Sequence, residues 1–296
     1  MELRHLRYFI ALAEELNFTQ AAERSHIEQP PLSRAIKELE EELGVLLFER
    51  NRRGTKLTAA GTAFLQDTRR LFSILEQARE NVRAVAAGMR GSLRIAVSDG
   101  ALDPRLSAFL AQCRAEEPEL EVRLSEVPLA DQLRGLRSGD FMLGFAHTAN
   151  VGEGIIAEPI WEDPLVIAIP ARHELLAHKE VPLHELGGHP LVLCDPRVCE
   201  GYCHELARLL GPLDHRQNVV EHVTSLDMML TLVGAGYGVG FIAATKIPAS
   251  QRPDVVIRPL AVESAIITTY LLRPDRDDVP VSLERFIIRL REGLGG

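Results

Sequence analysis

Two short helical patterns joined by a tight connection, in residues 18–44, constrain the fold more than any other feature of the chain. The stretch reads FTQAAERSHIEQPPLSRAIKELEEELG, and Thr19 is a suitable cap for a first helix over residues 20–25. The second pattern, residues 30–43, places its large apolar residues on one stripe: Leu32, Ile36, Leu39 and Leu43. Polar side chains fall on the opposite face, and Gly44 is a typical helix end. The spacing therefore predicts two packed helices with a tight turn between them.

The flanking residues complete a small domain. Residues 3–16 repeat apolar positions at helical spacing, which predicts a further helix. Downstream, the stretch VLLFERNRRGTKLT predicts two short strands, over residues 46–48 and 56–58. The hairpin between them, residues 50–56, carries four positive charges and no negative one. Helix, turn, helix and basic hairpin together predict a winged helix-turn-helix domain over residues 1–58.

The next segment predicts a long helix that pairs with a second copy of the chain. Thr58 is a suitable cap, and the helical pattern runs from there to about Ala87. Residues that are apolar apart from Thr68 alternate by four and three along it, a spacing typical of paired helices: Phe64, Thr68, Leu71, Leu75, Ala78, Val82 and Val85. The stripe is narrow and its flanks are charged, which favours pairing over the alternative of a helix packed on its own domain. We assign residues 59–89 to this linker helix and expect its stripe to hold a dimer.

From residue 90 onward the pattern changes to short apolar strands alternating with helices. The strands are predicted at LRIAV, LEVRLSEV, FMLGFA, PLVIAIP and AIITTYLL. Helices are predicted near residues 104–117, 129–138 and 226–233. This alternation is typical of parallel α/β units, and the roughly 200 residues available are enough for two lobes.

Charge and composition exclude some classes of protein. The formal net charge is −9, and residues 91–296 hold most of the acidity, with nineteen basic and twenty-nine acidic residues. Nucleic-acid binding depends on local positive patches, so an acidic chain is still compatible with it. No apolar run reaches the ~18 residues that a membrane span needs, and the first residues lack the layout of a signal peptide. We expect a cytoplasmic protein, not a membrane protein, and we expect its four cysteines to be reduced thiols.

The polar face of the 30–43 helix suits DNA. The major groove admits an α-helix, and a few side chains near its N-terminus read the bases. Gln29, Ser33 and Arg34 are suitable base-reading groups, and Pro30 offers an apolar surface to a thymine methyl group. The remaining basic side chains are expected on phosphates or in the minor groove: Lys37, Arg52 and Arg53. The alternative is a merely solvated polar face. One such unit is too small for tight, specific binding, so a two-fold dimer reading two half-sites is expected.

The same residues carry a family resemblance. The phrases FTQAAE, QPPLSRAIKELEEELG, LFER and LTAAG resemble the DNA-binding domain of LysR-type transcriptional regulators, and the match is dense over roughly the first 65 residues. GSLRIAV, EPELEVRLSE, LRSGDFMLGF, PLVIAIPARHELL and LVGAGYGVGFI resemble that family's effector domain more loosely. The resemblance implies DNA contacts by Gln29, Pro30, Ser33, Arg34 and Arg53. This chain has Pro31 where the family more often has alanine or serine.

The resemblance also implies an architecture. Residues 90–296 would form an effector-binding domain like a type 2 periplasmic binding protein. Lobe I would span about 90–162 and 268–296, and lobe II about 163–267. The fold class expected is thus α/β, with a winged helix-turn-helix, a long linker helix and a two-lobed domain. A homodimer, commonly assembled into a homotetramer as a dimer of dimers, is implied as well.

The implied effector site lies where the two lobes meet, at the ends of strands. Its residues are Ser98, Asp99, Pro128, Leu129, His147, Cys194, Arg197, Thr224 and Phe241. In the branch of the family that controls aromatic catabolism, a serine and a threonine hold the inducer. The serine follows the first strand of the effector domain, and the threonine follows the second. This chain offers Ser98 at the first place but Pro128 and Leu129, without a hydroxyl, at the second.

The chemical class of the effector stays open at this point. Asp99 disfavours anionic ligands, whereas His147 and Arg197 favour them, so an organic acid is one candidate. Thr224 or Ser225 has the equally weighted alternative of capping the helix that follows.

The stretch LCDPRVCEGYCHEL raises a second question, which is whether its cysteines have a redox role. Cys199 and Cys203 lie four residues apart and share a helical face, and the peroxide-sensing branch of the family keeps its redox cysteines in the corresponding lobe. We favour the interpretation that these cysteines, including Cys194, are ordinary reduced thiols without a redox role. The alternative function is a redox-responsive regulator that uses Cys199 and Cys203. The spacing fits no standard zinc pattern, so we expect no metal.

Enzyme motifs fail on spacing. HELLAH and HELGGH place their histidines five residues apart, whereas the zinc-protease motif needs four. GAGYGVG precedes a predicted strand and follows a helix, the reverse of the dinucleotide-binding order. We therefore expect a regulator without enzymatic activity or cofactor. Its expected partners are double-stranded promoter DNA, a small-molecule effector, further copies of the chain and RNA polymerase.

Overall fold

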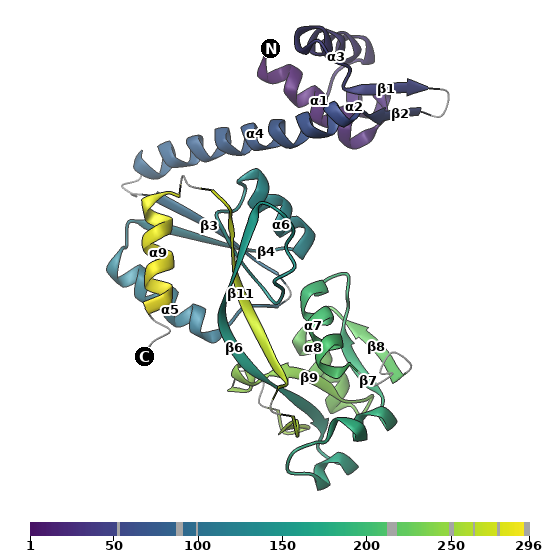
Figure 1. Cartoon of the computed structure of the whole chain (residues 1–296), viewed down its shortest axis with the longest axis vertical. Coiled ribbons are helices and arrows are strands. Elements are labelled where there is room, and N and C mark those ends of the chain that lie inside the picture. The colour runs from purple at the N-terminus through teal and green to yellow at the C-terminus, as the bar shows by residue number, and fades with distance from the viewer. Residues whose placement is uncertain are drawn as a thin grey trace. The chain divides into compact units, whose positions relative to one another are not determined.

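The computed structural model describes residues 1–51, 54–86, 91–98, 100–211, 218–248, 252–262, 264–276 and 279–292 (Figure 1). The chain divides into two compact units, whose main boundary lies between Glu80 and Asn81, within a long helix. Arg52, Arg53 and Asp99, which the sequence analysis singled out, lie outside the described residues.

The first unit is a winged helix-turn-helix, as the sequence predicts. Its elements in chain order are α1 (Leu3–Glu15), α2 (Phe18–Arg24), α3 (Gln29–Leu43), β1 (Phe48–Asn51) and β2 (Gly54–Leu57). β1 and β2 pair antiparallel. The apolar stripes of the three helices meet in one core, in which Phe9 lies fully buried against the rings of Phe48 and Phe64.

Two local predictions in this unit are wrong. α2 begins at Phe18, not Gln20, and Asn17 caps it by accepting hydrogen bonds from the backbone N–H groups of Thr19 (2.9 Å) and Gln20 (3.3 Å). Phe18 packs on the core, so the helix starts early enough to include it. The strands of the hairpin also lie closer to its tip than the predicted ranges 46–48 and 56–58.

The long helix α4 (Ala59–Ala86) begins where the sequence predicts. The Thr58 hydroxyl accepts a hydrogen bond from the backbone N–H of Gly61 at 2.9 Å, which is an N-cap contact. A Cβ atom on Gly61 would lie 2.1 Å from the carbonyl oxygen of Leu47. Glycine is therefore required here for the helix to lie close to the chain that enters the wing.

One end of the second unit, lobe I, is built on three parallel strands. β3 (Gly91–Val97) lies between β4 (Leu120–Glu126) and β5 (Leu143–Ala146). The helices α5 (Pro104–Glu116), α6 (Leu129–Ser138) and α9 (Val281–Glu292) complete this lobe. α9 joins the core of β3 and α5, where the rings of Phe109 and Phe286 meet edge to face at 4.9 Å.

Two long antiparallel strands, β6 (Ile155–Pro170) and β11 (Ile266–Pro274), connect lobe I to lobe II (Figure 1). β11 pairs with β5 in lobe I, whereas the second half of β6 pairs with β9 (Gly240–Ala243) and β10 (Val255–Pro259) in lobe II. The same two strands thus belong to both lobes, so any movement of one lobe against the other must bend them.

Lobe II adds a parallel pair, β7 (Leu191–Cys194) and β8 (Val219–Val223). Helices α7 (Glu200–Leu210) and α8 (Leu226–Gly234) follow these strands, with short 3₁₀ turns η1 (Glu174–Ala177), η2 (Leu183–Gly188) and η4 (Ala244–Lys246) around them. The predicted strands and helices of the α/β region are present, but β6 begins at Ile155, well before the predicted PLVIAIP strand. The expected parallel arrangement holds for β3, β4 and β5 and for β7 and β8, whereas β6 and β11 pair antiparallel. None of the helices in the described part of the chain is long and apolar enough to span a membrane.

Candidate functional site

Helix α3 has two faces of different character. Leu32, Ile36 and Leu39 are fully buried on one side. The side chains predicted to meet DNA lie on the other side: Gln29, Pro30, Arg34 and Lys37 are exposed, and Ser33 is half-buried. Lys37 also pairs with Glu41 one turn later, at 3.3 Å. α3 thus offers its N-terminal polar groups to solvent while its opposite stripe holds the domain together.

Two contacts fix α3 against the wing. Oε1 of Glu40 accepts hydrogen bonds from the backbone N–H groups of Leu47 (2.8 Å) and Phe48 (3.0 Å). Gly44 ends the helix with a φ of 70°, in the left-handed region that favours glycine. The carboxylate therefore links the helix to the start of β1 and sets the wing's position relative to α3.

The wing and the long helix carry the other predicted contacts. Asn51 pairs with Gly54 across the hairpin, on either side of Arg52 and Arg53. Along α4, Leu71, Ile74 and Val82 are large exposed apolar side chains, and Ile74 was not among the predicted ones.

The six residues predicted for the dimer do not share one environment. Leu75 is half-buried, Ala78 is exposed, and the side chain of Val85 is outside the description. Phe64 packs on Phe9 with ring centroids 5.0 Å apart, so it belongs to the core of the first unit rather than to an open stripe.

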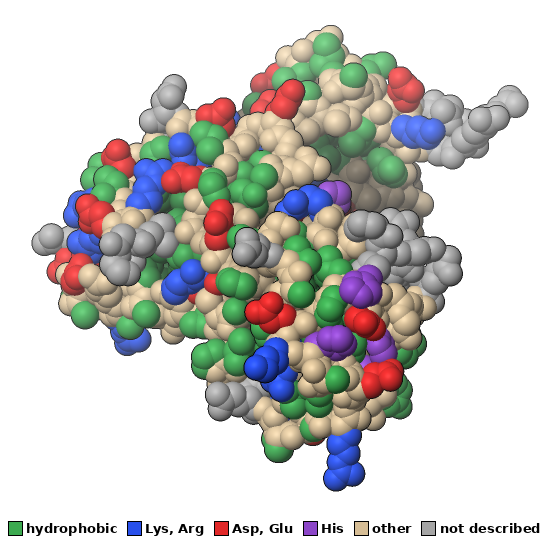
Figure 2. Space-filling view, turned by 60° about the horizontal axis from the view of Figure 1, so that its bottom comes forward, with side chains coloured by type: hydrophobic (Ala, Val, Ile, Leu, Met, Phe, Trp, Pro, Cys, Tyr) green, Lys and Arg blue, Asp and Glu red, His purple; other side chains and the backbone are tan. Residues whose placement is uncertain are grey.

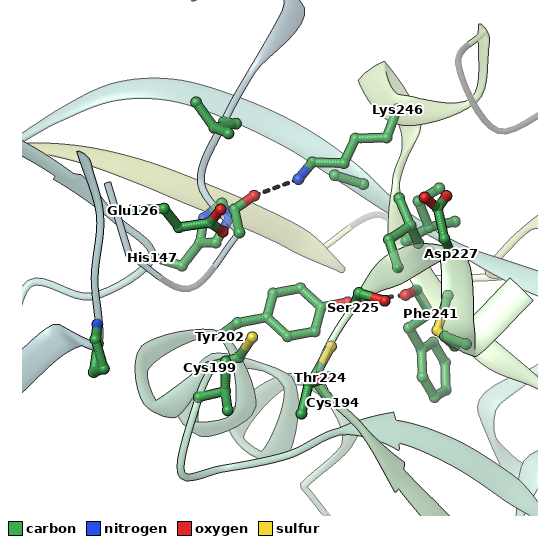
Figure 3. A pocket seen from close by; sticks show the side chains of 18 of the residues that line it. Glu126, His147, Cys194, Cys199, Tyr202, Thr224, Ser225, Asp227, Phe241 and Lys246 are labelled. Carbon is green, nitrogen blue, oxygen red and sulfur yellow. Dashed lines mark hydrogen bonds between the residues drawn. The ribbon is translucent and has the colours of Figure 1, made fainter. Parts of the chain in front are cut away.

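A cavity of about 630 Å³ lies in the second unit, where the two lobes meet. From lobe I it is lined by the loops that follow β3, β4 and β5, and from lobe II by the N-terminal ends of α7 and α8, by β9 and by η4. Figure 3 shows the labelled side chains of both lobes converging on this space. The volume suits a small organic molecule, since such sites are typically about 300–1,000 Å³.

The structure brings five of the predicted effector residues to the cavity wall: Pro128, His147, Cys194, Thr224 and Phe241. Three others are elsewhere. Ser98 is fully buried and donates a hydrogen bond to Oε1 of Gln132 at 2.9 Å, and Leu129 packs in the core under α6. The Arg197 side chain is 88% exposed, because its guanidinium turns back to Asp195 at 2.6 Å.

Lys246 is the main cationic group in the cavity wall, and it is not among the residues predicted from the sequence. It comes from η4 in lobe II, and its Nζ donates a hydrogen bond to the carbonyl oxygen of Gly100 in lobe I. Burial lowers the pKa of this ammonium, while Asp103 opposes that shift. A basic residue soon after an apolar strand was the available signal, but strand ends carry such residues for many reasons.

His147 lies on the lobe I side of the cavity and is only 4% exposed. Its Nδ1 is 3.2 Å from the carbonyl oxygen of Thr268 and 3.4 Å from the hydroxyl of Thr269, both on β11. Burial lowers the pKa of the ring to about 4, so the imidazole is neutral at pH 7.

The lobe II wall holds a buried tyrosine and the cysteine group. The Tyr202 hydroxyl donates to the carbonyl oxygen of Phe241 at 3.1 Å, and burial raises its pKa well above the usual value. Cys194 and Cys199 line the cavity, whereas the thiol of Cys203 donates to the carbonyl oxygen of Cys194 at 3.2 Å. All four cysteines are free thiols.

A charged network lies at the lobe junction. Arg105 binds Asp103 at 2.7 Å and Asp163 of β6 at 2.5 Å, and both carboxylates are nearly buried. Burial acts to raise the pKa of Asp103, but hydrogen bonds from Arg105 outweigh it and lower that pKa. At Asp163 burial has a larger effect than Arg105, so the pKa of this carboxyl is raised. Thr245, next to Lys246, lies 3.5 Å from Asp103, so the network touches both lobes.

Two further features of the described residues are their potential metal ligands and the distribution of charge on one face of the molecule (Figure 2). Among the residues that the structure describes, no group of three or more His, Cys, Asp or Glu side chains could hold a metal ion. On the face shown in Figure 2, positive and negative side chains are interspersed among hydrophobic ones, so the described acidic residues form no single-sign patch there.

Comparison with known families and proteins agrees with this arrangement. Residues 3–62 match the family model described as the bacterial regulatory helix-turn-helix protein, lysR family. Residues 86–295 match the model of the LysR substrate binding domain. The two matches cover the winged unit and the two-lobed unit respectively.

Individual relatives resemble the chain over most or all of its length. The uncharacterized HTH-type transcriptional regulator YnfL of Escherichia coli K12 is 32% identical over 295 residues, which is 99% of each chain. AlsR of Bacillus subtilis is 33% identical over 245 residues, covering 83% of this chain and 81% of AlsR. The crystal structure of CbnR, a LysR family transcriptional regulator, has a TM-score of 0.69 at 28% identity, with 99% of both chains covered. The structure of CbnR with its target DNA has a TM-score of 0.60 at the same identity, covering 99% of this chain and 100% of that one.

Proposed function

Because this chain belongs to the LysR family of DNA-binding transcriptional regulators, we propose that α3 reads promoter DNA and that a small organic acid in the cavity controls this binding. The observation that carries the proposal is the division of α3 into a buried apolar stripe and an exposed polar face at its N-terminus. Such a helix end matches the part that enters the major groove in helix-turn-helix proteins.

Each side chain that we propose to meet DNA has a role that follows from its chemistry. Arg34 binds guanine in a bidentate manner, and Gln29 does the same for adenine. Ser33 donates to a base edge, and Pro30 contacts a thymine methyl group. The basic side chains of Lys37, Arg52 and Arg53 hold phosphates, which set the position of the protein but do not read sequence.

The exposed apolar side chains of α4 support a homodimer, which can assemble further into a tetramer. Leu71, Ile74 and Val82 expose 39%, 54% and 70% of their surface, and such side chains on one helix favour burial in a helix pair. Two copies then place two α3 helices on two half-sites of DNA.

The cavity is proposed as the effector site, and its wall favours an amphipathic molecule. Its wall includes valine, leucine, methionine, phenylalanine and isoleucine side chains, and Lys246 supplies a cation for a carboxylate. A ligand that contacts both lobes favours one lobe arrangement over another, and it shifts DNA binding only by its difference in affinity for the two. The relatives are transcriptional regulators, so we propose a regulator without catalytic activity, working in the cytoplasm with RNA polymerase as its functional partner.

The test is selection of duplexes from a random library by the full chain, followed by titration of the selected duplex at several salt concentrations. A selected two-fold symmetric sequence and a steep salt dependence are expected. Enrichment of no sequence, or equal binding of selected and scrambled duplexes, would contradict the DNA-reading role. Thermal unfolding with a panel of organic acids tests the cavity separately, since a ligand at about 100 times its Kd stabilises by about 2.7 kcal/mol.

A further inference from the structure

The imidazole of His147 has a defined proton arrangement. Nδ1 lies 3.2 Å from the carbonyl oxygen of Thr268, and a carbonyl oxygen can only accept a hydrogen bond. We therefore assign the proton to Nδ1. The Thr269 hydroxyl, 3.4 Å from the same nitrogen, is a second acceptor for that proton. The other nitrogen, Nε2, is then left with a lone pair.

The neutral form of the ring is set by its surroundings. Burial is the main cause that lowers the pKa of His147 to about 4, and the nearby Lys246 ammonium acts in the same direction. Asp103 and the Thr268 carbonyl act in the opposite direction without outweighing burial. At neutral pH, Nε2 is therefore a hydrogen-bond acceptor and not a donor.

His147 is only 4% exposed and lines the cavity, and its Nδ1 faces β11. Nε2 lies on the opposite side of the imidazole ring, so we place it toward the cavity. Nδ1 is occupied by β11, and no described residue forms a hydrogen bond with Nε2. An acceptor of this kind, on a nearly buried ring that lines the cavity, can be satisfied by a donor on a bound molecule.

We infer that the effector presents an O–H or N–H donor to Nε2 of His147. A phenol or an alcohol is the simplest compound of this class. The inference rests on the proposed effector role of the cavity and adds a requirement to it. An ether, ester or carboxylate oxygen brings only lone pairs to Nε2, and an unmatched buried acceptor is costly.

The arrangement also orients an acid. A carboxylate placed against Nε2 would meet a lone pair, whereas near Lys246 it would meet an ammonium. A hydroxy acid satisfies both groups when its hydroxyl lies at His147 in lobe I and its carboxylate at Lys246 in lobe II. Such a ligand would bridge the two lobes with different ends of one molecule.

The first test examines the ring itself. Solid-state ¹⁵N NMR of the histidine-labelled full chain, compared with His147→Gln to identify the signal, reports the protonation of each ring nitrogen. A neutral ring with the proton on Nδ1 at pH 7 supports the inference. A proton on Nε2, alone or together with one on Nδ1, overturns it.

The second test uses matched probes and calorimetry on the full chain: phenol with anisole, and 3-hydroxybenzoate with 3-methoxybenzoate. We expect each hydroxyl compound to bind at least about tenfold more tightly than its methyl ether. In His147→Phe, which keeps a ring but has no acceptor, the ratio should fall to near one. His147→Gln, whose amide oxygen can accept, should keep part of the preference and guards against a folding defect in the phenylalanine variant.

Three results would overturn the inference: equal or tighter binding of the ethers, an unchanged ratio in His147→Phe, or binding of none of the four probes. Uptake of a proton on binding, seen as different heats in phosphate and Tris buffers, would also overturn it, because the ring would then have become a donor. Selective duplex binding by the same preparation shows whether the proposed regulatory function stands independently of this outcome.

Discussion

The winged unit and the two-lobed unit place their functional side chains differently with respect to their cores. In the winged unit, Arg34 and Lys37 are exposed on the face of α3 opposite the buried Leu32 and Ile36. Around the cavity, by contrast, His147 is itself nearly buried and bonded to the framework strand β11. The first arrangement allows binding and stability to change independently. The second couples them, because the groups that face the ligand also hold the lobes.

The largest loss of stability expected from this coupling is at the lobe junction, in the charged network around Arg105. Arg105→Met would leave Asp103 and Asp163, both nearly buried, without their shared cation. Breaking a buried ion pair costs about 3–5 kcal/mol, and the partial exposure of Arg105 places the expected loss near the lower end, at about 3 kcal/mol. Urea unfolding of the two-lobed unit measures it.

A matched arginine provides the control. Arg291 pairs with Glu158 at 2.8 Å on the surface of the same lobe, with both side chains partly exposed. Arg291→Met should cost less than about 1 kcal/mol. Equal losses in the two variants would mean that the junction network does not contribute more than a surface pair.

The second effect is a pH dependence from His147. Its folded pKa, about 4, lies below the ordinary value of 6.5, so the stability it contributes is present above pH 6.5 and is lost as the pH falls toward 4. Between pH 7 and pH 5 the wild type should lose about 2 kcal/mol more than His147→Gln.

The measurement is the free energy of unfolding at several pH values, with His184→Gln as the matched control because His184 is exposed. Parallel pH profiles for the wild type and His147→Gln would show that the ring is not held neutral by burial. That result would also weaken the proposed hydrogen-bond geometry in the cavity.

The third effect tests whether DNA binding and stability change independently in the winged unit. Arg34→Ala should weaken binding to a selected duplex by about 1–3 kcal/mol and relax the base preference at one position. The unfolding midpoint should stay unchanged, since the side chain lies outside the core. Repeating the duplex selection with the variant measures the preference. An unaltered sequence profile, or a loss of affinity that follows a loss of stability, would contradict the assigned role.

The two units also differ in how far the sequence predicts them. The helices and wing of the first unit follow from local spacing, and only the exact ends of some elements were predicted wrongly. At α2, the packing of Phe18 on the core places the N-cap at Asn17. The cavity is assembled from distant segments, and a family resemblance was needed to find His147 and Phe241. Lys246 was missed because its role depends on a contact across the lobes, with Gly100, which no local pattern encodes.

Arg197 illustrates the opposite error. The sequence places a cation next to the cavity segment, but Asp195 lies two residues earlier and its carboxylate captures the guanidinium. Hydrogen bonds from Arg197 lower the pKa of Asp195 to about 2. The local pair of Arg197 with Asp195 therefore explains why a predicted ligand contact is absent. The contact of Lys246 with Gly100, between the lobes, explains why an unpredicted cation lies in the cavity wall.

The smallest expected effect concerns the tip of the wing. Arg53→Ala removes one predicted phosphate contact in each copy of the chain, and phosphate contacts act through the release of counterions. The slope of log affinity against log salt should therefore decrease by about 1 for each half-site, while the sequence preference stays that of the wild type. Lys56→Ala, a basic residue of the same hairpin with no predicted DNA contact, is the matched comparison. If Arg53→Ala leaves the slope unchanged while Lys56→Ala reduces it, the strand rather than the tip holds the phosphate. If Arg53→Ala instead alters base preference, the tip reads sequence in the minor groove, and the division between reading by α3 and positioning by the wing must be redrawn.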